Sequence, residues 1–340
     1  MKKFFSVLLI LSLVFVAVGC GSDTDSSKDT ASGDQAGKAI VLKAGHTLAE
    51  DHPYQLGMLK FAELVSEKTN GQIKIEVFPN SALGGERDMV EGVQLGTVDM
   101  VLSSTGPLGG FVPELNVVDL PFLFKSREHA YKVLDGEIGQ DLLKGLENKS
   151  LVGLAWWENG FRNVTNNKRP IEKPEDLEGL KIRTMENEVH MASFETMGAD
   201  PTPMAFNELF TALQQGVVDG EENPVPIVMT SKFYEVQKYM TLTGHFYSPS
   251  VVMINKAKFD SFTEEQQNAL KEAAKEAADY ERGLIKQMDE EFVGQLKEKG
   301  MEIIENPDKA LFLEAVKPVY EKYESKFGKE LIESIQKAGE

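Results

Sequence analysis

Two arginines stand in sequence contexts that suit the binding of an anion. Arg162 lies in the segment NGFRNVT (159–165), and Arg183 lies in the segment GLKIRT (179–184). Because Arg183 follows the apolar Ile182 in a short strand-like run, we expect its side chain to point away from the face that Ile182 buries. A guanidinium at the end of a strand can present a planar pair of donors to a carboxylate. The alternative is an ordinary salt bridge to one of the 54 acidic residues of the chain.

The motifs of common enzyme classes are absent from the sequence, which contains no G-x-S-x-G, no P-loop, no G-x-G-x-x-G and no H-E-x-x-H. His46 and His52 lie six residues apart without a nearby cysteine, which is not the spacing of a metal site. The other three histidines are expected to be structural or to lie at the surface. The hydroxyl cluster 103–105 has no histidine near it in sequence. We therefore expect no catalysis, no cofactor and no bound metal.

Alternating strand-like and helix-like segments surround these residues. The first five form a strand, helix, strand, helix, strand series, which predicts a parallel sheet covered by helices and hence an α/β fold. The segment 200–203 (DPTP) is expected to break the chain between two helices. The predicted strands are 40–44, 72–78, 98–102, 151–157, 181–184 and 251–254, and the predicted helices are 54–69, 86–95, 189–197 and 206–215.

A long helix is predicted near the C-terminus. Thr263 and Gln266 have the spacing of a capping box, and the helical pattern then continues to about Lys299. At 1.5 Å per residue this helix would be about 54 Å long, which exceeds the width of one small domain. A chain of 340 residues is long enough for two domains. We expect the helix to bridge two lobes, with its Glu/Lys-rich face in solvent.

The N-terminus has the pattern of a secretion signal. Lys2 and Lys3 precede an uncharged apolar run, 4–18, that is too short to span a bilayer comfortably. The following residues, AVGC (17–20), resemble a bacterial lipobox, and the alternative is an ordinary cleavage site beside a coincidental cysteine. The Ser/Asp/Gly-rich stretch after Cys20 should act as a flexible tether. We expect a protein that is held by a lipid on the outer face of the cell membrane, or that is periplasmic.

The chain carries a formal charge of -18 and a single cysteine. This acidity argues against a nucleic-acid partner, which normally needs a concentrated basic surface. If Cys20 is lipidated, no thiol chemistry is left in the folded part.

An ordered series of blocks resembles the DctP family, the solute-binding proteins of TRAP (tripartite ATP-independent periplasmic) transporters. The resemblance covers about residues 40–335. Its most characteristic blocks are KIR (181–183), GADPTPMAF (198–206), GVVDGEENP (216–224) and DLPFLF (119–124), and further matches are GHT (45–47), HP (52–53), FAELV (61–65), TNG (69–71), PN (79–80) and SKFYEV (231–236).

The resemblance implies a two-lobed, periplasmic-binding-protein-like fold of type II that closes around an organic acid. It also implies delivery of that acid to the small and large membrane subunits of an ion-gradient-driven permease. The implied lobes are 39–160 with 249–288 and 161–248 with 289–340, after a signal peptide at 1–19 and a tether at 20–38. The implied substrate-binding residues are Arg183, which makes the main salt bridge to the carboxylate, with Arg162, Asn223, Phe206, His46 and Glu86.

The ligand could be a C4-dicarboxylate or a sugar acid such as a hexuronate. His46 and Ser103-Ser104-Thr105 offer hydrogen-bond partners for ligand hydroxyls, which favours a polyhydroxylated acid. The lack of a carboxylate in Ser103-Ser104-Thr105 argues against sialic acid. The alternatives are a receptor lipoprotein of an ABC importer and a lipid-anchored hydrolase. Trp156 and Trp157, near the presumed crossing between the lobes, should either report closure by fluorescence or simply pack in the core or hinge.

Overall fold

A computed structural model describes residues 39–339 of the chain. The expected signal peptide (1–19), lipidated Cys20 and tether (20–38) lie outside these described residues. Within them, no helix is both long and apolar enough to cross a membrane.

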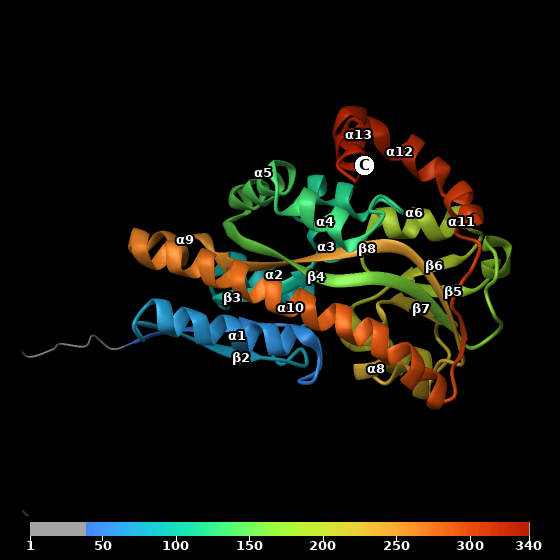
Figure 1. The fold of residues 1–340 in the computed structure, drawn as a ribbon, viewed down its shortest axis with the longest axis horizontal. Coiled ribbons are helices and arrows are strands. Elements are labelled where there is room, and N and C mark those ends of the chain that lie inside the picture. Colours follow the sequence, from blue (N-terminus) through green and yellow to red (C-terminus); the bar gives the residue numbers. More distant parts are fainter. Residues whose placement is uncertain (1–38, 340) are drawn as a thin grey trace, which may run out of the picture. The chain divides into compact units, whose positions relative to one another are not determined.

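One mixed sheet of nine strands organises the described chain (Figure 1). Eight strands follow the order β2-β1-β3-β8-β4-β7-β5-β6, and β9 pairs with β8 off this path. β1 pairs in parallel with β2 and β3 in one half of the sheet, and β5 pairs in parallel with β6 and β7 in the other half. The strands are β1 (Ile40–Gly45), β2 (Ile73–Phe78), β3 (Met100–Ser104), β4 (Leu151–Asn166), β5 (Lys181–Thr184), β6 (Asp200–Pro203), β7 (Gly220–Asn223), β8 (Tyr239–Asn255) and β9 (Glu302–Ile304).

The long antiparallel strands β4 and β8 join the two halves. β8 pairs with β3 of the first half, and β4 pairs with β7 of the second. Their mutual pairing shifts register between Gly153 and Ala155, between Glu158 and Gly160, and after Arg162. Such bulges bend a strand and increase its twist, so the sheet can bend between its two halves while β4 and β8 stay paired.

The helices that the sequence predicted agree closely with the structure, and the other helices were not predicted. The helix expected at 86–95 is found with the same bounds, and those expected at 54–69, 189–197 and 206–215 differ by one residue at one or both ends. The helices are α1 (Pro53–Lys68), α2 (Glu86–Leu95), α3 (Thr105–Leu108), α4 (Arg127–Leu134), α5 (Glu137–Gly145), α6 (Glu188–Thr196), α7 (Phe206–Gln214), α8 (Val225–Thr230), α9 (Lys256–Asp260), α10 (Glu264–Glu298), α11 (Lys309–Ala315), α12 (Lys317–Phe327) and α13 (Lys329–Lys337).

The predicted long helix is α10, with 35 residues. Its N-cap is Thr263, whose side chain accepts from the backbone N–H of Gln266, so the expected capping box is present. In Figure 1 α10 passes from the side of α1 to the side of α8. It packs against α1 and β4 at one end and contacts α8 and β9 toward the other, which confirms that it spans both halves.

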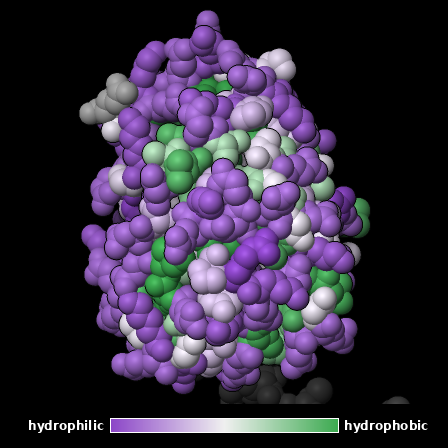
Figure 2. Space-filling view, turned by 90° about the vertical axis from the view of Figure 1, so that its right-hand side faces the viewer, coloured by the Kyte–Doolittle hydropathy of each residue, from purple (hydrophilic) through white to green (hydrophobic). Residues whose placement is uncertain are grey.

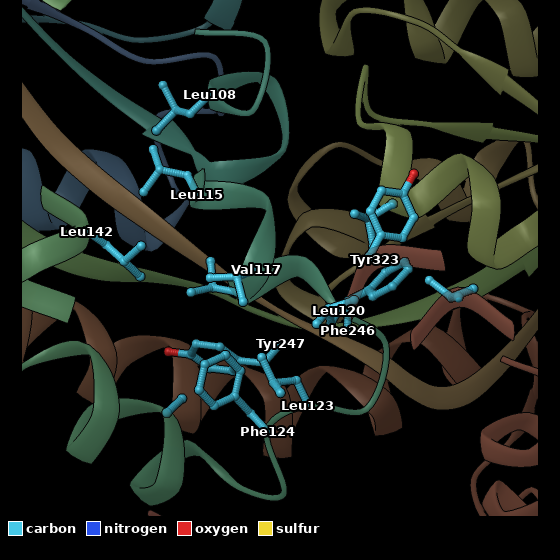
Figure 3. Close-up of a cluster of buried hydrophobic side chains, with 14 of the residues drawn as sticks. Leu108, Leu115, Val117, Leu120, Leu123, Phe124, Leu142, Phe246, Tyr247 and Tyr323 are labelled. Atoms are coloured by element: carbon cyan, nitrogen blue, oxygen red, sulfur yellow. The ribbon is translucent and has the colours of Figure 1, made fainter. Parts of the chain in front are cut away.

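The face drawn in Figure 2 is covered mainly by hydrophilic residues, with hydrophobic residues gathered in several smaller areas. Beneath the surface, two apolar cores lie on opposite faces of the sheet. Neighbouring strand residues alternate between them: Trp156 and Val251 belong to one core, and Trp157 and Val252 to the other. Figure 3 shows part of the first core, where the rings of Phe124 and Tyr247 meet edge to face at 5.5 Å.

The C-terminal helices pack on the core of Figure 3. The carbonyl of Ile335 in α13 lies 2.7 Å from Nε2 of His129 in α4, and Tyr320 donates to the carbonyl of Pro121 at 2.7 Å. The lobe boundaries stated above stay predictions.

Candidate functional site

A small buried cavity lies where the two halves of the sheet face each other. The space between its walls is about 270 Å³ with the part that is open to solvent, and the centre of a water-sized sphere can reach only about 10 Å³ of it, which is room for about one water. The parallel strands supply many of its walls from their carboxyl ends, the place where open α/β sheets typically bind ligands. The lining residues are Thr47, Leu48, Tyr54, Glu86, Ser104, Asn159, Arg162, Arg183, Met185, Phe206, Asn223 and Ile227.

Arg183 reaches the cavity from β5 and is 2 % exposed. Its Nε and one Nη donate to the carbonyl of Met204 at 2.9 and 2.7 Å, and Nη1 has no partner. No carboxylate of residues 39–339 lies within ion-pair distance of it. Burial, and then repulsion from Arg162, lower the pKa of Arg183 to about 10, so the side chain is still charged at neutral pH. Arg183 is therefore a buried cation without an ion-pair partner in the part of the chain that the structure describes.

Arg162, from β4, is fully buried and has a counter-ion. Its guanidinium forms an ion pair with Glu222 and also donates to Oδ1 of Asn223 at 3.1 Å, while Nη1 has no partner. Burial alone would lower the pKa of Arg162, but attraction to Glu222 outweighs it and the pKa is raised. The expected alternative of an ordinary salt bridge therefore applies to Arg162, although Arg162 also lines the cavity.

A buried polar network holds the Arg162–Glu222 pair. Burial would raise the pKa of Glu222, but Arg162 and a hydrogen bond with His245 hold it well below its usual range. The neighbouring Glu221 accepts from the Thr165 hydroxyl at 2.7 Å, and burial raises its pKa to about 7. One acid is thus firmly ionised and the other titrates near neutrality.

Asn223 and Phe206 both line the cavity. Asn223 ends β7 opposite Asn163 of β4, and its side chain bonds to both Arg162 and Glu221. Phe206 is the first residue of α7 and places its ring on the cavity wall, 6.0 Å from the ring of Phe233.

Glu86 also lines the cavity, from the first turn of α2. Its Oε1 accepts from the backbone N–H and hydroxyl of Ser104 at 2.8 and 2.9 Å, and from the Ser103 hydroxyl at 3.2 Å. These contacts tie α2 to the end of β3. Because the hydroxyls of Ser103 and Ser104 donate to Glu86, they hold α2 against β3 and do not donate to a ligand in this arrangement.

His46 is not brought to the cavity wall. The side chain is fully buried beneath the loop after β1, where Nε2 lies 2.8 Å from Oε1 of Gln55 and Nδ1 accepts from the backbone N–H of Leu48 at 3.2 Å. Burial lowers the pKa of His46 to about 4, so the ring is neutral. The resemblance implied that His46 contacts the ligand. Its ring nitrogens are instead bonded to Gln55 and to the backbone of Leu48, and Leu48 lines the cavity in its place.

The sequence reasoning missed six lining residues: Thr47, Leu48, Tyr54, Asn159, Met185 and Ile227. Asn159 begins the segment NGFRNVT (159–165), which also contains Arg162, so its polar side chain could have been predicted as a site residue. Tyr54 reaches the site only because α1 packs against the sheet, and no local pattern reveals that.

The two tryptophans lie in the cores. Both are almost fully buried, and their indole N–H groups donate to the carbonyls of Gly139 and Ala274, each at 3.0 Å. They precede the register shift at Glu158 in β4. Their use as reporters of closure stays a prediction.

Comparisons with known proteins agree with this geometry. Residues 44–326 match the family model DctP, described as bacterial extracellular solute-binding protein, family 7. A solute-binding protein of Verminephrobacter eiseniae is 46 % identical over 303 residues, covering 89 % of this chain and 90 % of its own length. The 2,3-diketo-L-gulonate-binding periplasmic protein YiaO of Escherichia coli is 42 % identical over 278 residues, covering 82 % and 85 %.

Among solved structures, a TRAP periplasmic solute-binding protein from a Polaromonas species, bound to D-erythronate, is 50 % identical with a TM-score of 0.86. The match covers 87 % of this chain and 98 % of that one. Fold, cavity and comparisons together define an extracytoplasmic solute-binding protein of the TRAP type. The chain belongs to the DctP family of bacterial extracellular solute-binding proteins. The solved relative is a solute-binding protein of the TRAP type, so neither the ABC-importer nor the hydrolase alternative gains support.

Proposed function

We propose that the chain captures an organic acid in the cavity and that Arg183 holds the ligand carboxylate. The observation that carries this proposal is the buried guanidinium of Arg183, which has an unpartnered Nη1 on the cavity wall and no carboxylate of the described chain to neutralise it. A buried charge is normally paired, so an anionic ligand is the natural counter-charge. Arg162 adds a second free donor, Asn223 an amide and Phe206 an apolar wall.

The ligands of solved relatives support this chemistry. Those proteins are bound to D-erythronate, galactonate, β-D-glucuronate and succinate, all of which carry at least one carboxylate. Each charge-assisted hydrogen bond contributes about 1.5–3 kcal/mol. A few such bonds, after ordering costs, are compatible with micromolar binding, which corresponds to about -8.2 kcal/mol.

The captured acid is delivered to the small and large membrane subunits of an ion-gradient-driven permease, and the protein is held at the membrane by lipid on Cys20. The lipobox-like segment AVGC (17–20) and the membership of the TRAP family support this part of the proposal. A Cys20→Ser variant should leave the membrane fraction in cell fractionation. An equal amount in the membrane fraction of both proteins would contradict the anchor.

The carboxylate assignment is tested by calorimetric titration with an acid that binds the wild-type protein. Arg183→Ala should weaken binding by up to roughly 100-fold, because the charge-assisted hydrogen bond from Nη1, worth about 1.5–3 kcal/mol, is lost. Arg183→Lys should retain part of the affinity, since it keeps the charge but not the planar pair of donors.

The matched control is Arg169→Ala. Arg169 is exposed and donates to the carbonyls of Asp176 and Glu178, so its removal should leave affinity unchanged. Wild-type affinity in folded Arg183→Ala would refute the assignment.

A further inference from the structure

The cavity offers donors and acceptors in separate places. Arg162 and Arg183 each present an unpartnered Nη1, which can only donate, whereas Oδ1 of Asn159 is a buried acceptor without a partner. An unsatisfied buried polar atom costs roughly 1–3 kcal/mol, so each indicates a complementary group on the ligand. The arginines require an acceptor such as a carboxylate. Asn159 requires a donor, which a carboxylate cannot supply.

Glu86 adds a second acceptor to the cavity wall. All three of its hydrogen bonds from the protein end on Oε1, from the backbone and hydroxyl of Ser104 and the hydroxyl of Ser103. Oε2 is left to accept from a ligand. A ligand hydroxyl can donate to it, whereas a ligand carboxylate beside it would meet a like charge.

The ion pairs of the site leave one cation, Arg183, for a ligand carboxylate, and the acidic Glu86 lies on the same cavity wall. Arg162 is neutralised by Glu222. Burial would raise the pKa of Glu222, but the attraction of Arg162 outweighs this effect and keeps the carboxylate ionised. Arg183 is the remaining cation, because no carboxylate of residues 39–339 pairs with it. A second ligand carboxylate on the side of Glu86 would meet a like charge there, with the uncharged hydroxyl of Tyr54 as a donor.

We infer that the site selects a hydroxylated monocarboxylate of the sugar-acid class and discriminates against dicarboxylates. The carboxylate binds Arg183 and the free donor of Arg162, and the hydroxyls donate to Oε2 of Glu86 and Oδ1 of Asn159. This inference rests on the proposed function, because it takes capture of an organic acid in this cavity as given.

The first test compares ligands of equal chain length by titration calorimetry. D-Erythronate and succinate form the four-carbon pair, and D-gluconate and adipate the six-carbon pair. In at least one pair the hydroxyacid should bind about tenfold or more tightly than the diacid. Tighter binding of succinate or adipate, lost in Arg183→Ala, would overturn the selectivity and leave the proposed function intact. If none of the four acids binds, the inference falls, and failure of a wider panel of carboxylates would remove the proposed function as well.

The second test changes the acceptors. Glu86→Gln should weaken the hydroxyacid about tenfold and leave the diacid unchanged or improved, so the ratio of the two affinities falls. Glu91→Gln is the control, because Glu91 lies on the same helix, is half exposed and pairs with Arg87. It should preserve the ratio.

Since Glu86 also ties α2 to β3, Asn159→Ala provides a second variant. The one hydrogen bond of its side chain is a long one, 3.4 Å, to the Ser248 hydroxyl. It should reduce the ratio in the same direction. An unchanged ratio in both variants, with cooperative thermal unfolding retained, would overturn the inference.

Discussion

Arg162 and Arg183 show how two side chains of the same type take different roles. Both are buried on the wall of one cavity, but Arg162 is held by Glu222 and Arg183 rests on a carbonyl alone. A carbonyl stabilises a cation less than a carboxylate does, and the lowered pKa of Arg183 reflects burial and the nearby Arg162. Binding of an anion should therefore stabilise Arg183 most.

Glu281 is a second buried charge site, away from the proposed ligand. It is fully buried in α10, its Oε1 has no partner, and its Oε2 accepts from the backbone N–H of Glu158 at 3.2 Å. Burial, followed by repulsion from Glu158, raises the pKa of Glu281 well above its usual range, and attraction to Arg282 and Arg127 does not cancel this. The carboxyl therefore keeps its proton to a higher pH than an exposed glutamic acid does.

This protonation predicts a pH-dependent effect of Glu281→Gln. In the wild type, the unfolded chain loses the proton above about pH 4.3 while the folded chain keeps it, so stability falls as pH rises from there toward the folded pKa. Glutamine cannot ionise in either state and avoids this loss. Between pH 4 and pH 7 the variant should therefore lose less stability than the wild type, by about 1.4 kcal/mol for each unit by which folding raises the pKa of Glu281 within that range, and the difference should vanish near pH 4.

Urea unfolding at pH 4 and pH 7 measures the effect of Glu281→Gln. Glu272→Gln on the same helix is the control, since Glu272 is exposed and makes only a 3.6 Å surface pair with Lys68. A variant that loses stability at pH 7 but not at pH 4 would mean that the carboxyl is ionised and stabilising.

At the scale of elements, the predicted helices are confirmed while two strands are much longer than expected. α10 could be predicted because a capping box and a continuous helical pattern are local features. β4 continues from Trp157 to Asn166, through a segment rich in Asn and Gly that is more typical of a loop. The reason is the register shift after Glu158, where Gly160 adopts a φ of 119° with Pro224 close by. The Asn and Gly residues, which are typical of turns, here form a β-bulge inside a long strand.

The segment DPTP (200–203) separates α6 from α7 as expected, but it does so as a strand. It forms β6 and pairs in parallel with β5 at the edge of the sheet. Proline is tolerated there because an edge strand has one side without a hydrogen-bonding partner. A local pattern predicts a break at this segment, and only its place in the whole sheet makes it a strand.

The candidate site was predictable mainly through the family resemblance. The described chain places Arg183, Arg162, Asn223, Phe206 and Glu86 on one cavity, although they come from β5, β4, β7, α7 and α2. Local patterns alone singled out only the arginines. The remaining lining residues come together through the pairing of β4 with β8 and β7 and the packing of α1, which depend on contacts between distant segments.

At the scale of the whole molecule, the net charge of -18 and the sign of the ligand are separate matters. Surface charges are screened over about 8 Å at physiological ionic strength, whereas buried groups are screened much less. The cavity can therefore favour an anion while the surface stays acidic. A larger open groove, lined in part by Phe122, Arg127 and Lys309, contains none of the six expected site residues.

The central claim is that Arg183 holds the ligand carboxylate inside the cavity between the two halves of the sheet. A crystal structure of the complex with D-erythronate, or with the tightest ligand of the panel, tests it most directly. We predict a carboxylate oxygen about 3 Å from Nη1 of Arg183. A carboxylate bound away from Arg183, or a ligand seated in the outer groove beside Arg127 and Lys309, would contradict the account.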